Sequence, residues 1–315
     1  MVLSEKIKVG VVGVGYLGKL HARIYSESED VQLVAVADTD KGRAEDIARQ
    51  TGSKPFVDYS ELFGKVNAVS IAVPSGLHYR VASDFLNQGI DILIEKPITD
   101  SVADAEGLVR MAGDKDLILQ VGHIERFNPG YIALKGLVHK PMFIDAQRLS
   151  PFTERGTDVD VTIDLMIHDI DIILSLVKSD ISEIKATGMP MLTPRIDMAS
   201  ARIEFKNGCI ANITAGRIFH GKTRRIRVFE EENYLSLDYL TTEIIEHKKK
   251  LKDGRPTQDI RHIKPEKFDP LKEELNSFVQ SVRKRTKPVI SGIEATEALK
   301  VALKVSEIIN ENTHS

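Results

Sequence analysis

The first third of the chain alternates short apolar runs with amphipathic helical patterns. Strands buried on both faces of a sheet read as continuous Val, Ile and Leu, whereas the helices that cover them repeat every 3.6 residues or so. The predicted strands are 7–12, 33–37, 68–73, 92–94 and 117–121, and the predicted helices begin at 17 and 77 or span 42–50 and 102–112. This alternation predicts an α/β domain with a doubly wound parallel sheet over residues 1–122.

Beyond Gly122 the pattern changes to longer runs in which apolar and polar residues alternate. The strands expected there are 199–205, 209–215, 226–229 and 234–240. Asn207-Gly208 separates the first pair and predicts a tight hairpin turn. We therefore expect an α+β domain over residues 123–315 with an open, mostly antiparallel sheet. Its amphipathic closing helix, 294–309, is expected to pack back on the first domain.

Composition narrows the classes of partner. A chain of 315 residues suits two domains, and a net charge of −3 gives no bulk attraction to nucleic acid or to a membrane. Cys209 is the only cysteine, which excludes an intrachain disulfide and thiol-rich zinc sites. No run approaches the length of a membrane span, and the first residues lack the apolar core of a signal peptide. We expect a cytoplasmic protein with no nucleic-acid partner, no membrane partner and no metal.

The first strand runs into its helix through three glycines, Gly13, Gly15 and Gly18, in GxGxxG spacing. The first glycine permits a tight turn, the second lets the main chain approach a phosphate, and the third lets helix and strand pack closely. The new helix then presents unpaired N–H groups to an anion. We predict that this turn, with Tyr16 and Leu17 inside it, binds a dinucleotide pyrophosphate in a Rossmann domain.

Asp38 ends the second apolar run, about 20 residues after the last glycine. A carboxylate there accepts the ribose hydroxyls of the adenosine and repels a 2′-phosphate. NAD is therefore favoured over NADP. Lys41 and Arg43 follow closely and would soften that repulsion.

Polar residues follow the other predicted strands. Ligands of open α/β sheets bind beyond the carboxyl ends of the strands, so these positions are candidates for contact with cofactor or substrate. Pro74, Ser75 and His78 follow one strand, and Glu95-Lys96 follows the next. His78 is expected to order the cofactor loop, with a helix-capping or surface role as the alternative.

A predicted helix over 163–176 carries Asp164 and His168, four residues apart and so on one face. Oxidation of an alcohol needs a base for the hydroxyl proton, and imidazole titrates near neutral pH. His168 is the candidate base, Asp164 would orient it, and Lys96 would hydrogen-bond the reacting oxygen. The alternatives are a half-buried structural histidine and a solvated strand-end lysine. A metal cluster with Asp169 and Asp171 is disfavoured, because these lie on other faces of the helix.

Five ordered motifs resemble the Gfo/Idh/MocA family of sugar and inositol dehydrogenases. They read GVVGVGYLGKLHARIY, VSIAVPSGLHYRVA, ILIEKPITDS, VGHIERFNP and DLMIHDIDI. The resemblance implies a Rossmann domain followed by an open-sheet domain. It places the family's catalytic lysine on Lys96 and its aspartate and histidine on Asp164 and His168. The family often has a glycine pair before that aspartate, where this chain has Asp160-Val161-Thr162-Ile163.

Within the family, VGHIERFNP and TAGRIFHGKTRRIRVF are similar to dehydrogenases that oxidise the 3-hydroxyl of UDP-N-acetylglucosamine. Arginine forks suit the pyrophosphate of such a substrate. The candidate substrate contacts, beside Lys96, Asp164 and His168, are His123, Arg126, Asn128, Arg155 and Arg217, with Arg224 and Arg225 also available.

Two other functions remain open at this stage. One is a dehydrogenase of another sugar, an inositol or a UDP-sugar acid, and the other is a non-catalytic NAD-sensing regulator. The resemblance implies a homodimer or homotetramer. The basic run 247–255 lacks interleaved aromatic residues and is interpreted as a solvated hairpin rather than a nucleic-acid site.

Overall fold

The computed structural model describes residues 5–153, 156–157, 159–252 and 255–313. The chain forms two compact units, one of residues 1–124 with 269–296 and the other of residues 125–268 with 297–315. The first unit thus extends two residues past the boundary expected from the sequence, 122. It also takes in 269–296, a segment that the sequence pattern had assigned to the second domain.

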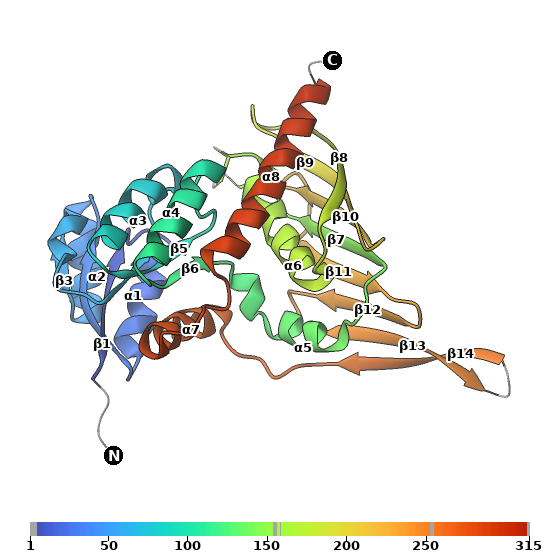
Figure 1. The fold of residues 1–315 in the computed structure, drawn as a ribbon, viewed down its shortest axis with the longest axis horizontal. Coiled ribbons are helices and arrows are strands. Elements are labelled where there is room, and N and C mark those ends of the chain that lie inside the picture. Colours follow the sequence, from blue (N-terminus) through green and yellow to red (C-terminus); the bar gives the residue numbers. More distant parts are fainter. Residues whose placement is uncertain (1–4, 154–155, 158, 253–254, 314–315) are drawn as a thin grey trace. The chain divides into compact units, whose positions relative to one another are not determined.

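A six-stranded, fully parallel sheet in the order β3-β2-β1-β4-β5-β6 forms the centre of the first unit. The doubly wound α/β fold predicted from the apolar runs is confirmed (Figure 1). The strand order reverses between β1 and β4, and the crevice at such a point binds ligands. The elements are β1 (Ile7–Val12), α1 (Gly18–Glu27), β2 (Val31–Ala37), α2 (Lys41–Thr51), β3 (Lys54–Phe56), η1 (Tyr59–Leu62), β4 (Ala68–Ile71), η2 (Ser75–Leu77), α3 (His78–Asn87), β5 (Asp91–Glu95), α4 (Val102–Asp114), β6 (Leu119–Gly122) and α7 (Pro270–Lys284).

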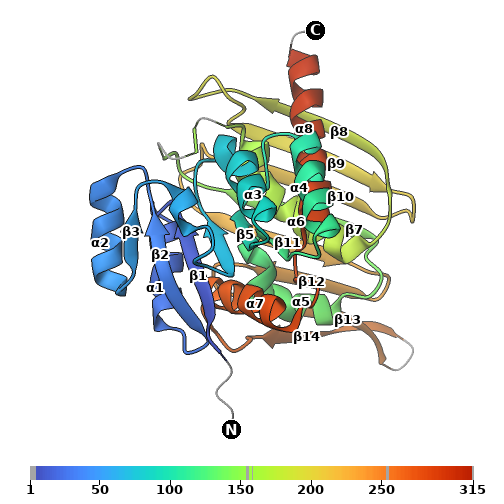
Figure 2. The same cartoon turned by 60° about the vertical axis from the view of Figure 1, so that its left-hand side comes forward.

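Helix α7 completes the core of the first unit, although it comes from the far end of the sequence (Figure 2). Its Leu275 and Phe278 are fully buried in one cluster with Val9 of β1 and with Ala22 and Tyr25 of α1. The missed signal is its amphipathic pattern, which begins after the capping residue Asp269. Sequence distance gives no indication of which sheet such a helix covers.

The second unit is built on an eight-stranded sheet in the order β14-β13-β12-β11-β7-β10-β9-β8. Every neighbouring pair is antiparallel except β7 with β10, so the predicted open, mostly antiparallel sheet is confirmed. Its elements are η3 (Ile124–Phe127), α5 (Pro129–Leu137), β7 (Phe143–Leu149), a π-helical turn η4 (Thr162–Met166), α6 (Ile167–Val177), β8 (Ile181–Met189), β9 (Met198–Phe205), β10 (Ile210–Gly216), β11 (Thr223–Phe229), β12 (Asn233–Asp238), β13 (Ile244–Lys252), β14 (Arg255–Ile263) and α8 (Gly292–Thr313).

The closing helix α8 corrects one expectation. Its apolar residues Ala298, Val301, Ala302, Val305 and Ile309 are buried in the same cluster as the inner face of the eight-stranded sheet. The helix was expected to pack on the first domain, but only its first residues, up to Thr296, belong to that unit. Alternate residues of the strands are buried under α6 and α8, which pack on one face of the sheet (Figure 1).

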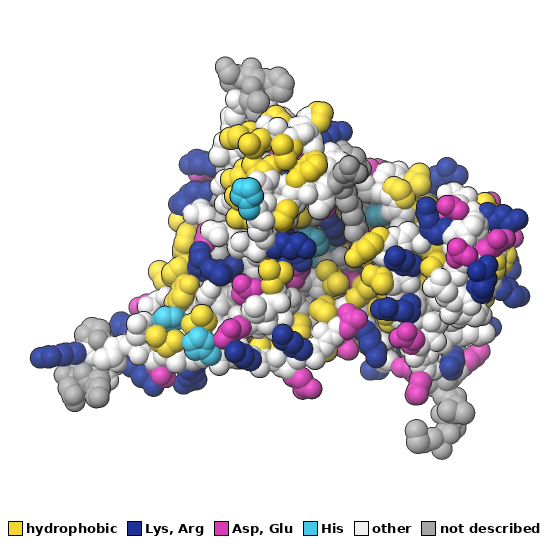
Figure 3. Space-filling view, turned by 180° about the vertical axis from the view of Figure 1, so that it is seen from behind, with side chains coloured by type: hydrophobic (Ala, Val, Ile, Leu, Met, Phe, Trp, Pro, Cys, Tyr) yellow, Lys and Arg dark blue, Asp and Glu magenta, His cyan; other side chains and the backbone are white. Residues whose placement is uncertain are grey.

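The hairpins follow the turn signals of the sequence. Gly208 has a φ of +87°, and β9 pairs with β10 around it as predicted. The described part of the basic run, residues 247–252 and 255, lies in the β13–β14 hairpin, along which Lys, Arg and His side chains gather (Figure 3). Residues 253–254 of the run lie outside the described residues. Part of this charge is neutralised within the hairpin, because Lys250 lies 2.7 Å from Asp259 and Arg261 lies 3.6 Å from it.

The described residues contain neither a helix suited to span a membrane nor a cluster of metal ligands. None of the helices in that part of the chain is long and apolar enough to cross a membrane. No group of three or more His, Cys, Asp or Glu side chains in it is arranged to hold a metal ion.

Candidate active site

The glycine turn after β1 has the geometry of a dinucleotide site. Gly13 has a φ of +80°, and a Cβ atom there would lie 2.7 Å from the carbonyl oxygen of Ala72. A Cβ on Gly18 would overlap the carbonyl oxygen of Gly13. Gly15 differs, since a Cβ atom placed on it would have no neighbour within 4 Å. The turn is therefore closed at its first and third glycines and open at the second, where a pyrophosphate approaches the main chain.

Asp38 stands directly after β2, at the carboxyl edge of the sheet, and is almost fully buried. Its Oδ2 accepts a hydrogen bond of 2.9 Å from the Val14 amide, which ties it to the glycine turn. Arg43 Nη1 lies 3.2 Å from Oδ1, so this arginine does lie beside the carboxylate, as the sequence suggested. Lys41 instead lies 3.8 Å from Glu45.

His78 connects two loops at the same edge of the sheet. Its Nδ1 lies 2.7 Å from the carbonyl oxygen of Pro97, and its Nε2 lies 2.9 Å from that of Val73. The histidine is 1% exposed, which excludes the surface role. It therefore joins the loop that holds Pro74 and Ser75 to the turn after Lys96, and its role in ordering a cofactor loop stays a prediction.

Lys96 and Glu95 end β5, and their environments differ. Lys96 is half-buried and precedes a cis peptide bond to Pro97. Glu95 is buried, with Oε1 3.1 Å from His21 Nε2, and His21 Nδ1 lies 2.6 Å from Ser70 Oγ. Burial opposes ionisation of Glu95, but its contact with His21 and the charge of Lys96 leave its pKa below the usual range. Glu95 was predicted to bind the cofactor, and the structure instead places its carboxylate against His21.

Glu274 of α7 is a second buried carboxyl in this region of the first unit. It is fully buried, and burial together with the charge of Glu95 raises its pKa well above the usual range. Neither of its carboxyl oxygens has a hydrogen-bond partner among the residues that the structure describes. An ionised form would leave an unpaired buried charge, so the carboxyl holds a proton in the folded protein.

Glu274→Gln is expected to remove a loss of stability at high pH. A raised folded-state pKa contributes stability that is complete below the unfolded pKa and is lost as the pH rises through the folded pKa. Between those two pKa values, wild type should lose about 1.4 kcal/mol per pH unit relative to the variant. Urea unfolding from pH 5 to 9 measures this, with Glu273→Gln, the exposed neighbour, as control. Parallel pH curves for wild type and Glu274→Gln would contradict the assignment.

Asp164 and His168 lie at the start of the helical segment of the second unit. The predicted single helix over 163–176 is a π-helical turn, η4, that carries Asp164, followed by α6, which carries His168. Both side chains are half-buried. π-Helical turns inside helices occur frequently at functional sites. The Asp164 amide donates to the Asp160 carbonyl oxygen at 3.0 Å, which ties the turn to the residues before it.

A buried charge cluster supports this helix from the sheet. Arg148 of β7 donates from Nε to Asp169 Oδ2 at 2.8 Å and from Nη2 to Oδ1 at 3.0 Å. Its Nη1 donates to Glu125 Oε1 at 2.8 Å. Burial raises the pKa of Asp169, and Arg148 opposes that shift. Asp169 follows His168 directly, so the cluster fixes the helix where the candidate base lies.

Several predicted substrate contacts have partners inside the second unit. Arg126 donates from Nε to Asp171 Oδ2 at 2.6 Å and from Nη2 to Oδ1 at 2.9 Å, and it is 7% exposed. Asn128 caps α5 by accepting from the Gly130 amide at 2.9 Å. Arg217 is 4% exposed, and its guanidinium contacts protein atoms. We therefore propose no substrate contact for these three residues.

The other candidates named from the sequence include Arg155, His123 and Arg224. Arg155 lies outside the described residues. His123 follows β6 in the first unit and is 1% exposed. Arg224 of β11, which the sequence offered only as one of several arginines, is 41% exposed on its side chain, and its Nη1 lies 3.7 Å from Glu125. Burial and the charge of Arg148 lower the pKa of Arg224, while Glu125, Asp169 and Asp164 oppose the shift. Arg224 thus presents a cation near Asp164 that is open to solvent.

Comparison with known families agrees with this geometry. Residues 7–123 match the oxidoreductase family model of the NAD-binding Rossmann fold, GFO_IDH_MocA, and residues 138–236 match the C-terminal domain model of the same family. A UDP-N-acetylglucosamine 3-dehydrogenase of Acidithiobacillus ferrooxidans is 34% identical to the chain, over 95% of this chain and 96% of the relative. The chain belongs to the Gfo/Idh/MocA family.

Two further likenesses concern fold and chemistry. The solved structure of UDP-N-acetylglucosamine 3-dehydrogenase GnnA from Acidithiobacillus ferrooxidans superposes with a TM-score of 0.89 at 32% identity, over 97% of this chain and 98% of that one. The scyllo-inositol 2-dehydrogenase (NAD(+)) of Bacillus subtilis is 27% identical, over 96% of this chain and 93% of the relative.

Family membership and the glycine turn together define the enzyme class. This Gfo/Idh/MocA protein is an NAD-dependent oxidoreductase that acts on a CH–OH group. Gly13, Gly15, Gly18 and Asp38 fit the cofactor, because the turn is open at Gly15 and the carboxylate stands at the end of β2. The places of Gly13, Gly18 and Asp38 were predictable from the motif. The contacts of His21 with Glu95 and Ser70 were not.

Proposed function

We propose that the protein oxidises the C3 hydroxyl of UDP-N-acetylglucosamine to the 3-keto sugar. The observation that carries this proposal is the likeness to the UDP-N-acetylglucosamine 3-dehydrogenase over 95% of the chain. The sequence resemblance, which implies catalytic roles for Lys96, Asp164 and His168, supports it. A non-catalytic regulator would not need these three residues.

Each of the three residues has a separate role in the proposed reaction. His168 accepts the proton of the sugar hydroxyl, because an imidazole on a fixed helix is a suitable base near neutral pH. Asp164 orients the imidazole and stabilises the imidazolium. Lys96 donates a hydrogen bond to the reacting oxygen and favours its anionic form. Gly13, Gly15, Gly18 and Asp38 would hold NAD, which would supply the acceptor for the C3 hydride.

Arg224 is proposed as the contact for the anionic part of the substrate in the second unit. Its guanidinium is partly exposed and lies 3.7 Å from the carboxylate of Glu125, whose stronger partner is Arg148 at 2.8 Å. A planar guanidinium binds phosphate oxygens in bidentate fashion. This role replaces the ones expected for Arg126 and Arg217.

The test is an incubation of the enzyme with NAD and a panel of alcohols, with hydroxylamine present to trap any ketone as its oxime. The panel holds UDP-N-acetylglucosamine, UDP-N-acetylglucosaminuronic acid, free sugars and inositols, and products are identified by mass spectrometry. We expect an oxime from UDP-N-acetylglucosamine alone, at C3 by fragmentation. An oxime from an inositol instead would overturn the substrate, and NAD binding without any oxime would favour the regulator.

A further inference from the structure

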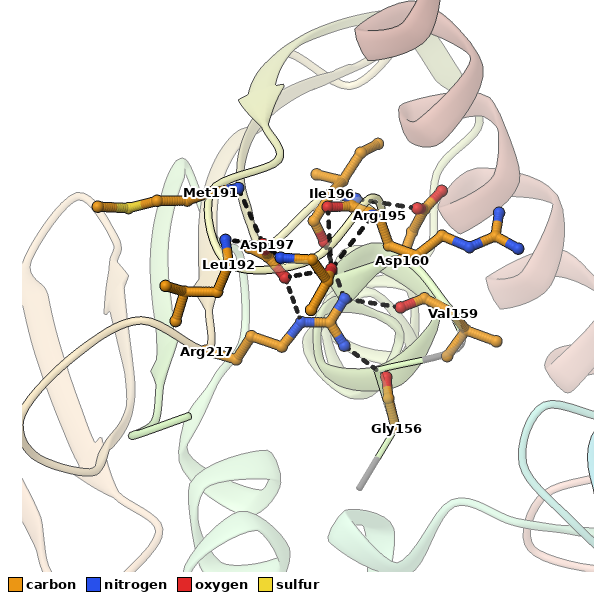
Figure 4. Close-up of polar contacts among 10 residues, drawn as sticks. Gly156, Val159, Asp160, Met191, Leu192, Arg195, Ile196, Asp197 and Arg217 are labelled. Atoms are coloured by element: carbon orange, nitrogen blue, oxygen red, sulfur yellow. Dashed lines mark hydrogen bonds and ion pairs between the residues drawn. The ribbon is translucent and has the colours of Figure 1, made fainter. Parts of the chain in front are cut away.

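Arg217 and Asp197 form a buried ion pair between β9 and β10 of the second unit. Asp197 precedes β9 and is 0% exposed, while Arg217 follows β10 and is 4% exposed. Arg217 Nε donates to Asp197 Oδ1 at 2.8 Å (Figure 4). The Arg217 amide donates to the Asp197 carbonyl oxygen at 3.0 Å. A side-chain pair and a backbone bond therefore join the same two residues.

Asp197 is saturated with donors. Its Oδ2 accepts from the amides of Met191, Leu192 and Thr193 at 2.9, 2.7 and 2.8 Å, and its Oδ1 also accepts from Thr193 Oγ1 at 2.8 Å. Burial opposes the charge, but these hydrogen bonds hold the pKa of Asp197 far below its usual range. The carboxylate is thus a fixed, ionised anchor for Arg217.

The far side of the Arg217 guanidinium contacts the segment that leads to Asp164. Nη1 donates to the carbonyl oxygen of Gly156, and Nη2 donates to that of Val159 at 2.8 Å and to that of Ile196 at 3.2 Å (Figure 4). Ile196 binds the same segment, since its amide donates to Asp160 Oδ1 at 3.1 Å. We call Arg217, Asp197, Gly156, Val159 and Ile196 the Arg217 cluster.

Gly156 lies against the carboxylate of Asp164. It has a φ of +74°, and a Cβ atom there would lie 2.8 Å from Asp164 Oδ2. Only glycine combines this backbone conformation with so close an approach. The carbonyl of the same glycine is the one that Arg217 binds. The Arg217 cluster therefore fixes the backbone that borders the Asp164 carboxylate.

We propose that Arg217 is a positioning residue: through Gly156 it fixes the orientation of the Asp164 carboxylate. The inference rests on the proposed function, in which Asp164 orients His168. Arg217 contacts neither substrate nor cofactor in this role. It acts on the reaction only through the backbone of Gly156 and Val159.

The test compares Gly156→Ala and Arg217→Lys with a matched glycine control, Gly208→Ala. Gly208 also has a positive φ, +87°, but no atom lies within 4 Å of its Cβ position. Gly208→Ala therefore reports the effect of backbone strain alone, whereas Gly156→Ala adds the contact with the Asp164 carboxylate. We expect kcat to fall about tenfold or more for Gly156→Ala and Arg217→Lys, with the KM for NAD unchanged, and no change in kcat for Gly208→Ala.

A double-mutant cycle with Asp164→Ala separates positioning from folding. If Arg217 acts through Gly156 on Asp164, neither Arg217→Lys nor Gly156→Ala lowers kcat further once the Asp164 carboxylate is gone. Full additivity with Asp164→Ala, or kcat values within twofold of wild type for both single variants, would overturn the proposal.

If the proposed function is wrong, wild type oxidises no alcohol in the panel. In that case, amide hydrogen exchange still tests whether Arg217 fixes the backbone next to Asp164. Arg217→Lys should speed exchange at the amides of Val161 and Asp164, whose acceptors are Ile196 and Asp160, and not in β10. Unchanged exchange at those two amides would overturn it.

Discussion

Replacing His168 by asparagine is expected to lower kcat for sugar oxidation by about 100-fold or more, the usual scale for the loss of a general base. Asparagine keeps a polar side chain of similar reach but takes up no proton. The affinity for NAD should not change, because the proposed partner of His168 is the sugar hydroxyl, whereas the proposed cofactor contacts are the glycine turn and Asp38. The loss is therefore confined to the chemical step.

Single-turnover rates with UDP-N-acetylglucosamine measure that step, and NADH fluorescence measures cofactor affinity. His139→Asn is the control, since His139 is an exposed histidine of the same unit that precedes β7. Its rate should equal that of wild type. A His168→Asn rate within a few-fold of wild type would reject His168 as the base.

The fold of the first unit was predictable because the segments that are apolar in the sequence are the ones that are buried in the structure. A strand such as 7–12 is apolar for most of its length, and in the structure its residues from Val9 onward are buried. The short edge strand β3 was missed, because Lys54 and Pro55 are exposed and leave no apolar run. Helix α7 was assigned to the wrong domain. Its apolar face predicts that the helix is buried, but it does not indicate which sheet the helix covers.

The role of a site residue was predictable where that role depends on its neighbours in the sequence. The glycines require their spacing and Asp38 its place after a strand, so both could be read from the motif. Arginines are different, since their role depends on which carboxylate the fold brings to them. Arg126 and Arg217 were expected to bind a pyrophosphate, but their carboxylate partners, Asp171 and Asp197, occupy them.

Buried polar networks were the least predictable part. Arg148 falls in the alternating pattern of β7 on the inward face, where an apolar residue would be expected, and it is stabilised there by Asp169 and Glu125. An inward-facing charge in such a pattern signals a buried ion pair, although the pattern does not identify the partner. His21 gives the same signal on the apolar face of α1, next to Ala22 and Tyr25.

Alanine at Gly15 and at Gly18 should separate cofactor binding from folding. A Cβ at Gly15 meets no protein atom within 4 Å, so Gly15→Ala is expected to fold with wild-type stability. It should still weaken NAD binding by at least about tenfold, roughly 1.4 kcal/mol, because the methyl group occupies space that the pyrophosphate approaches. Gly18→Ala should lose both stability and affinity, since its methyl group would overlap the Gly13 carbonyl oxygen.

Thermal unfolding with and without NAD, together with NADH fluorescence titration, measures the two effects independently. Gly113→Ala in α4 is the control: nothing lies within 4 Å of its Cβ position, and alanine favours a helix by about 1 kcal/mol over glycine. That variant should be as stable as wild type or more so, with unchanged NAD affinity. Wild-type affinity in Gly15→Ala would mean that the pyrophosphate does not pass over the second glycine. The open position of the turn would then need another explanation, because close approach of the main chain to a phosphate is the physical reason for glycine there.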